Sequence, residues 1–194
     1  RRIFPSIIST RKLCEKEIEY LGNGIFSIGS GVSIQNAITY MMNYGYGGLE
    51  YLYYIPGTIG GMITMNAGVY SPEKCNISDY ICKVESFSDG EIVERDKYEC
   101  EFGIRDSCFR RNNDIILSAT FQMNKIDRGC CQNRIKQRRV VVEKQQDRRF
   151  PNVGSVFRKC NMDVMASMLG RRSGNIMWSE KTANWLLNLG GTFE

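Results

Sequence analysis

The sequence predicts a protein of the α+β class, in which helices and strands occupy separate stretches of the chain. Two observations carry this prediction. An amphipathic helical pattern lies near the N-terminus, and the strand patterns that follow are joined by turn residues without regular strand–helix alternation. The 194 residues suffice for one domain of ordinary size, or for one domain and part of another.

The first expected elements are a strand and a helix. Residues 24–28 (GIFSI) form a short strand pattern, and a GSG turn follows at 29–31. Ser33 is a typical N-cap and Gly45 a typical C-terminal stop, so we expect a helix between them. Apolar residues recur at helical spacing within this stretch: Ile34, Ala37, Ile38, Met41 and Met42.

A β-hairpin is expected further along the chain. Strand patterns over 80–87 and 91–94 flank the turn residues 88–90 (SDG). Residues 114–123 (DIILSATFQM) give the strongest strand signal in the sequence, and residues 124–129 are expected to be a linker.

The C-terminal part is expected to contain two helices, and one element stays open. Residues 133–148 predict a polar, basic helix with Ile135 and Val142 as apolar anchors. Residues 161–169 predict a short helix capped by Asn161. The segment NWLLN at the end of the chain fits either a helix or a strand by its periodicity.

Composition excludes several kinds of chemistry. The chain has no histidine, which rules out Ser-His-Asp triads, Cys-His pairs and His-ligated zinc. Its eight cysteines form no C-x-x-C pair and no metal-ligand spacing, and we expect no signal peptide, since the first residues lack a long apolar core. We therefore expect no metal and mostly buried, reduced thiols in a cytoplasmic protein. No apolar run approaches the roughly 18 residues of a membrane helix.

Positive charge is concentrated in one region. The net charge is +5, and residues 134–172 contain eleven Lys or Arg against three Asp or Glu. This pattern is typical of a solvated basic helix, and it also suits a nucleic acid or a small polyanionic ligand. The three interpretations stay open at this level.

Residues 55–68 (IPGTIGGMITMNAG) combine glycines with apolar neighbours, unlike a plain surface loop. Glycine permits close backbone approach, so PGTIGG is able to cradle a pyrophosphate. The segment equally suits a tight-turned connection inside a β-rich core. It is not the dinucleotide-binding G-x-G-x-x-G, since it does not open a helix within a βαβ unit, and no Gly-Lys-Ser/Thr follows it.

Two further segments contain candidate functional residues. Arg105, in EFGIRDSCF, is able to grip a carboxylate or phosphate bidentately. The alternative is a structural ion pair with Asp106 or Glu101. Ser155, in PNVGSVFRK, cannot be a triad nucleophile without histidine, so it is either a proton donor or a turn serine.

The order of these segments resembles the UDP-N-acetylenolpyruvoylglucosamine reductases, flavoenzymes that make UDP-N-acetylmuramate for peptidoglycan. That family carries GLEFLxGIPGTVGGAxxMNAGAYGGE, and this chain has GLEYLYYIPGTIGGMITMNAGVYSPE. It carries FGYRDSxF where this chain has FGIRDSCF. Its PSAGSVFK and QVSEKHANFIVN are similar to PNVGSVFRK and MWSEKTANWLLN. The resemblance covers essentially the whole chain.

The resemblance implies a fold and a reaction. It implies part of an FAD-binding domain of the vanillyl-alcohol-oxidase type over 1–125, and part of an α+β domain that binds the UDP-sugar over 126–194. In the family NADPH reduces the flavin, which delivers hydride to the enolpyruvyl group of UDP-N-acetylenolpyruvoylglucosamine. A serine then protonates the neighbouring carbon.

The resemblance also implies site residues. Ser155 matches the proton donor, and Arg105 matches the arginine that stabilises the developing enol through the substrate carboxylate. Arg158 and Lys159 follow Ser155 and are expected to bind substrate. The residues that match the flavin-lining motif are Ile55, Pro56, Gly57, Thr58, Gly60, Gly61, Asn66 and Gly68.

Some family features are absent from this sequence. Ile104, Met177 and Thr182 stand where the family motifs have tyrosine, glutamine and histidine. Neither the upstream GGGSNLL loop nor the C-terminal glutamate motif is found, so we expect an internal fragment that is inactive alone. A monomer without a nucleic-acid or membrane partner is expected. The alternatives are a non-catalytic relic of the fold and a basic nucleic-acid-binding module.

Overall fold

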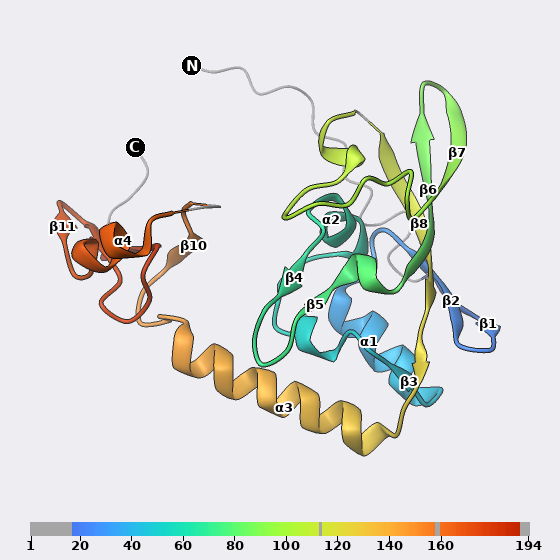
Figure 1. The fold of residues 1–194 in the computed structure, drawn as a ribbon, viewed down its shortest axis with the longest axis horizontal. Helices are drawn as coiled ribbons and strands as arrows, with labels where there is room; N and C mark the ends of the chain where they lie inside the picture. Colours follow the sequence, from blue (N-terminus) through green and yellow to red (C-terminus); the bar gives the residue numbers. More distant parts are fainter. Residues whose placement is uncertain (1–16, 113, 158–159, 191–194) are drawn as a thin grey trace. The chain divides into compact units, whose positions relative to one another are not determined.

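The structure is a computed structural model that describes residues 17–112, 114–157 and 160–190. The chain folds into two compact units, which divide after Arg138. The domain boundary that we expect after residue 125 lies before this division, and it stays a prediction. Figure 1 shows the order of the elements along the chain.

The first unit is built on a five-stranded antiparallel sheet (Figure 1). Its strands lie in the order β1-β2-β8-β6-β7, so β8 is inserted between strands that come much earlier in the chain. The bounds of these strands are Ile18–Gly22 (β1), Ile25–Gly29 (β2), Ile81–Ser88 (β6), Glu91–Asp96 (β7) and Ile115–Gln122 (β8).

The predicted strands and hairpin are confirmed, with ends that differ by one or two residues. Asp89 and Gly90 join β6 to β7, and their φ angles are +49° and +92°. Positive φ at both turn residues matches the twist of the strands that such a turn connects. β8 pairs on both sides, so its apolar sequence belongs to the centre of the sheet.

The predicted N-terminal helix is also confirmed, as α1 (Ile34–Asn43). The Ser33 hydroxyl accepts a hydrogen bond from the Asn36 N–H at 3.2 Å, and Gly45 follows the helix with φ +77°. All five apolar residues that define the periodic pattern are buried. Local sequence therefore determines both ends of α1 and its buried face.

A second helix, α2 (Ile59–Thr64), lies inside the glycine-rich segment and is not expected from the sequence. Glycine is a poor helix former, and Gly60 and Gly61 lower the intrinsic propensity of these six residues. Burial of Ile59 and Ile63 against the core overrides that preference. The segment does open a helix, but a 3₁₀ turn and a two-residue strand flank it instead of a βαβ unit.

The core of the first unit lies between the sheet and the two helices (Figure 1). Phe26 and Ile28 of β2 and Phe121 of β8 are fully buried, in one cluster with the buried faces of α1 and α2. Short elements complete the unit: β3 (Tyr46–Gly47) with β9 (Asn124–Lys125), β4 (Gly68–Val69) with β5 (Cys75–Asn76), and the 3₁₀ turns η1 (Glu50–Leu52), η2 (Ile77–Asp79) and η3 (Cys108–Arg110).

The basic helix is α3 (Arg128–Gln145), and it begins earlier than predicted. The Asp127 carboxylate accepts hydrogen bonds from the N–H groups of Gly129 at 2.6 Å and Cys130 at 3.3 Å. An aspartate before the first turn satisfies free backbone donors in this way, so the expected linker ends in a helix cap. Val142 is buried and Ile135 packs against the core, as predicted.

The second unit contains a four-stranded antiparallel sheet in the order β10-β13-β12-β11. The predicted short helix is α4 (Met162–Met168), and the Asn161 side chain accepts from two N–H groups of its first turn. The segment NWLLN supplies a strand, β13. The strand bounds are Asn152–Ser155 (β10), Arg172–Ser173 (β11), Ile176–Trp178 (β12) and Trp185–Asn188 (β13).

Neither a membrane-spanning helix nor a metal cluster occurs within the described ranges. All seven described cysteines are free, and only Cys75, Cys100 and Cys131 are buried. The expectation that most thiols are buried is therefore wrong. Burial raises the pKa of each of these three thiols to about 12, which keeps them protonated and unreactive near neutral pH.

Candidate active site

The glycine-rich segment lies against the turn that follows β2. The Gly60 N–H donates to the Ser30 carbonyl at 2.9 Å, and the Ile59 N–H donates to the Val32 carbonyl at 2.8 Å. In return the Ile34 N–H donates to the Gly57 carbonyl at 3.2 Å. Backbone hydrogen bonds therefore join residues 57–60 to the start of α1.

Two glycines in this segment are required by close approach. A Cβ on Gly60 would lie 3.0 Å from Ser30 Cβ, and a Cβ on Gly68 would collide with Asn76 Oδ1. Gly57 and Gly61 are exposed, and a Cβ on either would meet no atom closer than 3.8 Å. Gly60 and Gly68 thus serve internal packing, whereas Gly57 and Gly61 face outward and are available to a ligand.

Arg105 lies beside the end of the same segment. Its Nη2 donates to the Gly68 carbonyl at 2.5 Å and its Nη1 to the Asn66 carbonyl at 3.4 Å. Its φ is +54°, a left-handed conformation that non-glycine residues rarely adopt and that often marks functional sites. The structure thus brings Arg105, Asn66 and Gly68 together.

The carboxylates next to Arg105 in sequence pair with other arginines. Arg111 bridges Glu101 and Asp106, the latter at 2.6 Å, and Arg110 lies 3.6 Å from Asp106. In the described part of the chain, Arg105 forms no ion pair with a carboxylate. The alternative of a structural ion pair between Arg105 and Asp106 or Glu101 is wrong.

Two side chains fix the Arg105 loop to α2 and the residues after it. The buried Ser107 hydroxyl donates to the Thr64 carbonyl at 2.8 Å, and Asn66 Nδ2 donates to the Gly103 carbonyl at 2.9 Å. Beside this junction lies a cavity of about 410 Å³, lined by Asn66, Tyr70, Lys74, Asn76, Ser78, Phe102, Gly103, Ile104 and Arg105. A guanidinium without a carboxylate partner therefore faces a cavity of ligand size.

Buried polar atoms at both ends of α2 lack partners. In the part of the chain that the structure describes, Ser30 Oγ, Asn66 Oδ1 and Arg138 Nε are buried without a hydrogen bond. Ser30 contacts Gly60 near the start of α2, and Asn66 follows the end of the helix. Buried polar groups normally form hydrogen bonds. Ser30 Oγ and Asn66 Oδ1 therefore fit a site in which a polar ligand supplies the missing bonds.

Ser155 belongs to the second unit, at the end of β10, and its side chain is exposed. Trp185 is its partner across the strand pair, and the indole Nε1–H donates to Ser155 Oγ at 3.3 Å. Arg158 and Lys159 lie outside the described residues. Ser155 and Arg105 belong to different units.

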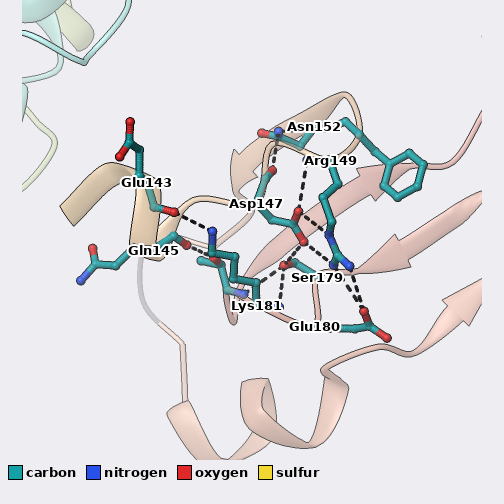
Figure 2. A network of polar contacts seen from close by, with 10 residues as sticks. Glu143, Gln145, Asp147, Arg149, Asn152, Ser179, Glu180 and Lys181 are labelled. Carbon is teal, nitrogen blue, oxygen red and sulfur yellow. Dashed lines mark hydrogen bonds and ion pairs between the residues drawn. The ribbon is translucent and has the colours of Figure 1, made fainter. Parts of the chain in front are cut away.

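A buried carboxylate joins the segment before β10 to the segment before β13 (Figure 2). Asp147 is fully buried and accepts from Arg149 Nη2 and from the Ser179 hydroxyl, both at 2.8 Å. These hydrogen bonds, that of Arg149 first, hold the pKa of Asp147 well below its usual range. Arg149 also reaches the exposed Glu180 at 3.3 Å. The carboxylate is thus ionised at neutral pH. It fixes residues 179–184, the SEKTAN segment, through Ser179.

The SEKTAN segment also caps α3 (Figure 2). Lys181 Nζ donates to the Glu143 carbonyl at 2.6 Å, and the Thr182 hydroxyl donates to the Gln145 carbonyl. These carbonyls belong to the last turn of the helix. Carbonyl groups of a last turn have no hydrogen-bond donor within the helix itself. The Ser179 hydroxyl in turn accepts from the N–H groups of Lys181 and Thr182 at 3.0 and 2.9 Å. By itself the sequence of this segment gave no sign of these contacts.

Comparisons with known proteins show the family and the fold of the chain. The profile of the family described as "FAD binding domain" matches residues 6–95. A UDP-N-acetylenolpyruvoylglucosamine reductase from Fusobacterium nucleatum is 32% identical, over 94% of this chain and 65% of that protein. Reductases of the same name from Thermotoga sp. and Thermotoga petrophila are each 32% identical over 97% of this chain, and over 64% and 67% of their own lengths.

A solved structure shares the fold. The crystal structure of UDP-N-acetylenolpyruvylglucosamine reductase from Thermus caldophilus matches with a TM-score of 0.73 at 24% identity. The match covers 86% of this chain and 62% of that one. Fold and profile together define an α+β protein with an FAD-binding domain.

The chain belongs to the UDP-N-acetylenolpyruvoylglucosamine reductase family. It spans 65% and 64% of the length of the first two relatives that it matches. The fold class and family that the sequence motifs predict are therefore confirmed. The unpartnered atoms of Ser30 and Asn66 fit FAD, because its ring imide and ribityl hydroxyls offer hydrogen-bond donors.

Proposed function

We propose that this chain is part of an NADPH-dependent flavoenzyme that reduces UDP-N-acetylenolpyruvoylglucosamine to UDP-N-acetylmuramate. The single observation that carries the proposal is the placement of Arg105. Its guanidinium is tied to the Asn66 and Gly68 carbonyls of the glycine-rich segment and has no carboxylate partner there. The other N–H donors of this guanidinium are therefore available to an anionic group in the adjoining cavity.

The residues that would hold FAD lie along the glycine-rich segment and the turn before α1. When bound, FAD supplies hydride to the substrate and receives it from NADPH. Ile55 and Thr58 would contact the ring, and Gly57 and Gly61 would allow its close approach. Pro56, Gly60, Asn66 and Gly68 complete the set that we assign to the cofactor.

Arg105 would stabilise negative charge on the substrate. Addition of hydride next to a carboxylate builds enolate charge that the carboxylate shares, and a guanidinium can bind that carboxylate with two parallel hydrogen bonds. The hydrogen bonds to the Gly68 and Asn66 carbonyls hold the guanidinium in place before substrate arrives. Preorganisation of this kind lowers the cost of reaching the transition state.

Ser155 would donate the proton that completes the reduction. The carbon that it protonates is strongly basic at that moment, so a weak acid such as a hydroxyl suffices. We assign Arg158 and Lys159 to the UDP-linked substrate, within a substrate domain over 126–194. We also propose that the protein is a cytoplasmic monomer and that it acts in peptidoglycan synthesis.

Structural contacts weigh against the nucleic-acid alternative. Arg134 pairs with the buried Glu50 at 3.3 Å, and Arg138 donates to the Ser71 carbonyl at 2.7 Å. Arg149 is paired with Asp147 at 2.8 Å. Three cations of the basic region thus serve internal contacts, which leaves fewer of them to contact phosphates.

A pair of arginine variants tests the proposal. Arg105→Lys keeps the charge but removes the bidentate geometry, so the substrate concentration needed for half-maximal flavin reoxidation should rise about tenfold or more. Arg111→Lys is the matched control, because Arg111 is exposed and pairs with Asp106, at 2.6 Å, and with Glu101, and within the described residues it makes no hydrogen bond with Arg105. Both variants are made in the enzyme of which this chain is part. Stopped-flow absorbance of the flavin measures both. Equal behaviour of the two variants would remove the role of Arg105.

A further inference from the structure

Asn184 clamps the backbone of the two residues that follow Ser155. The Val156 N–H donates to the Asn184 carbonyl at 2.9 Å. The Asn184 side chain accepts from the Phe157 N–H at 2.8 Å and donates to the Phe157 carbonyl at 2.7 Å. Asn184 has φ +67°, a conformation that asparagine tolerates better than most residues. The chain directly after Ser155 is therefore fixed by Asn184, the residue before β13.

The next residue after the clamp contacts the hydroxyl itself. Trp185 directly opposes Ser155 in the β10–β13 pairing, and its indole Nε1 lies 3.3 Å from Ser155 Oγ. An indole N–H is only a donor, so it occupies one lone pair of the hydroxyl oxygen. The hydroxyl proton is then left to point to a different acceptor.

This arrangement favours loss of the serine proton. When the hydroxyl gives up its proton, the oxygen becomes negative and the indole N–H bond to it becomes charge-assisted. A hydrogen bond that is stronger to the charged form lowers the free energy of the ionised state relative to the neutral state. The donor thus matters more during proton transfer than before it, which is the condition for an effect on rate.

We propose that Trp185 is a positioning residue that orients Ser155 and supports its proton donation. The inference rests on the proposed function. The family segment that matches residues 177–188 has phenylalanine at this position, so the indole N–H is a feature of this chain and not of the motif. Trp185→Phe removes the donor and keeps an aromatic ring on β13.

The kinetic test uses the enzyme of which this chain is part and separates the two half-reactions. Trp185→Phe should leave flavin reduction by NADPH unchanged and slow flavin reoxidation by UDP-N-acetylenolpyruvoylglucosamine about tenfold, the size expected for one hydrogen bond to a charged oxygen. The substrate concentration for half-maximal rate should not change. Trp178→Phe is the matched control: Trp178 stacks on Phe157, at 6.2 Å between ring centroids, and among the described residues the indole that donates to Ser155 Oγ is that of Trp185.

An independent test needs neither cofactor nor turnover. The chain has two tryptophans, so its ¹⁵N spectrum contains two indole signals, which Trp178→Phe and Trp185→Phe assign. Ser155→Ala should shift the Trp185 signal and leave the Trp178 signal in place. This readout reports the hydrogen bond itself.

The outcomes distinguish the inference from the proposed function. Slow reoxidation in both Ser155→Ala and Trp185→Phe, with a shifted Trp185 signal, supports the inference. Slow reoxidation in Ser155→Ala alone, or a Trp185 signal that ignores Ser155→Ala, overturns it. Normal reoxidation in Ser155→Ala overturns the proposed role of Ser155, even if the spectrum confirms the hydrogen bond.

Discussion

The buried carboxylate of Asp147 should be the main electrostatic anchor of the second unit. Arg149 contacts two carboxylates, Asp147 with a fully buried side chain and Glu180 with a side chain that is 61% exposed. Replacing either one by alanine removes a carboxylate partner of the same guanidinium. The pair Asp147→Ala and Glu180→Ala therefore compares a buried contact with an exposed one.

The expected magnitudes differ because burial differs. Asp147→Ala leaves the buried Ser179 hydroxyl without its acceptor at 2.8 Å, which costs about 1–3 kcal/mol, and it removes a charge-assisted bond. We expect a total loss of about 2–3 kcal/mol in the free energy of unfolding. Glu180→Ala removes only an exposed ion pair and should cost about 0–1 kcal/mol.

Tryptophan fluorescence during urea unfolding measures this difference selectively. Trp178 and Trp185, the two tryptophans of the chain, both lie in the second unit, so the signal follows that unit. The midpoint should fall clearly in Asp147→Ala and hardly at all in Glu180→Ala, with similar slopes. Equal losses in the two variants would show that burial does not make Asp147 the anchor.

Two further predictions concern acid stability and the glycine-rich segment. Because hydrogen bonds depress the pKa of Asp147 in the folded state, its contribution is complete above the ordinary aspartate value of about 3.9 and is lost as pH falls below it. The stability gap between the unmodified protein and Asp147→Asn should therefore narrow from pH 7 to pH 3 in urea titrations; a constant gap would contradict this. Gly60→Ala should lower the melting temperature relative to Gly61→Ala, because its Cβ would lie 3.0 Å from Ser30 Cβ whereas that on Gly61 meets nothing closer than 3.8 Å. Calorimetry that ranks Gly61→Ala lower would contradict the close approach at Ser30.

Sequence predicted best those elements whose signals are local. The start and end of α1 follow from Ser33 and Gly45, and its buried face follows from one periodic run. The prediction missed α2, since two glycines lower its propensity and only burial of Ile59 and Ile63 supports it. Helix formation there is a tertiary effect that a local window does not contain.

The candidate site likewise has features that the sequence predicts and features that only the fold shows. The motifs predict roles for Arg105 and Ser155, but the local sequence left an ion pair between Arg105 and Asp106 open. Only the fold shows that Arg111 takes both nearby carboxylates. The contact of Trp185 with Ser155 joins residues thirty positions apart, so pairing of β10 with β13 had to be known first.

The visible spectrum of the enzyme of which this chain is part, recorded during one anaerobic turnover, is the most direct test of the proposed reaction. We predict that this enzyme binds FAD, that NADPH bleaches the flavin absorbance, and that UDP-N-acetylenolpyruvoylglucosamine restores it in the unmodified enzyme but not in Ser155→Ala. A protein that binds no FAD, or whose reduced flavin is left unchanged by the substrate, would contradict it.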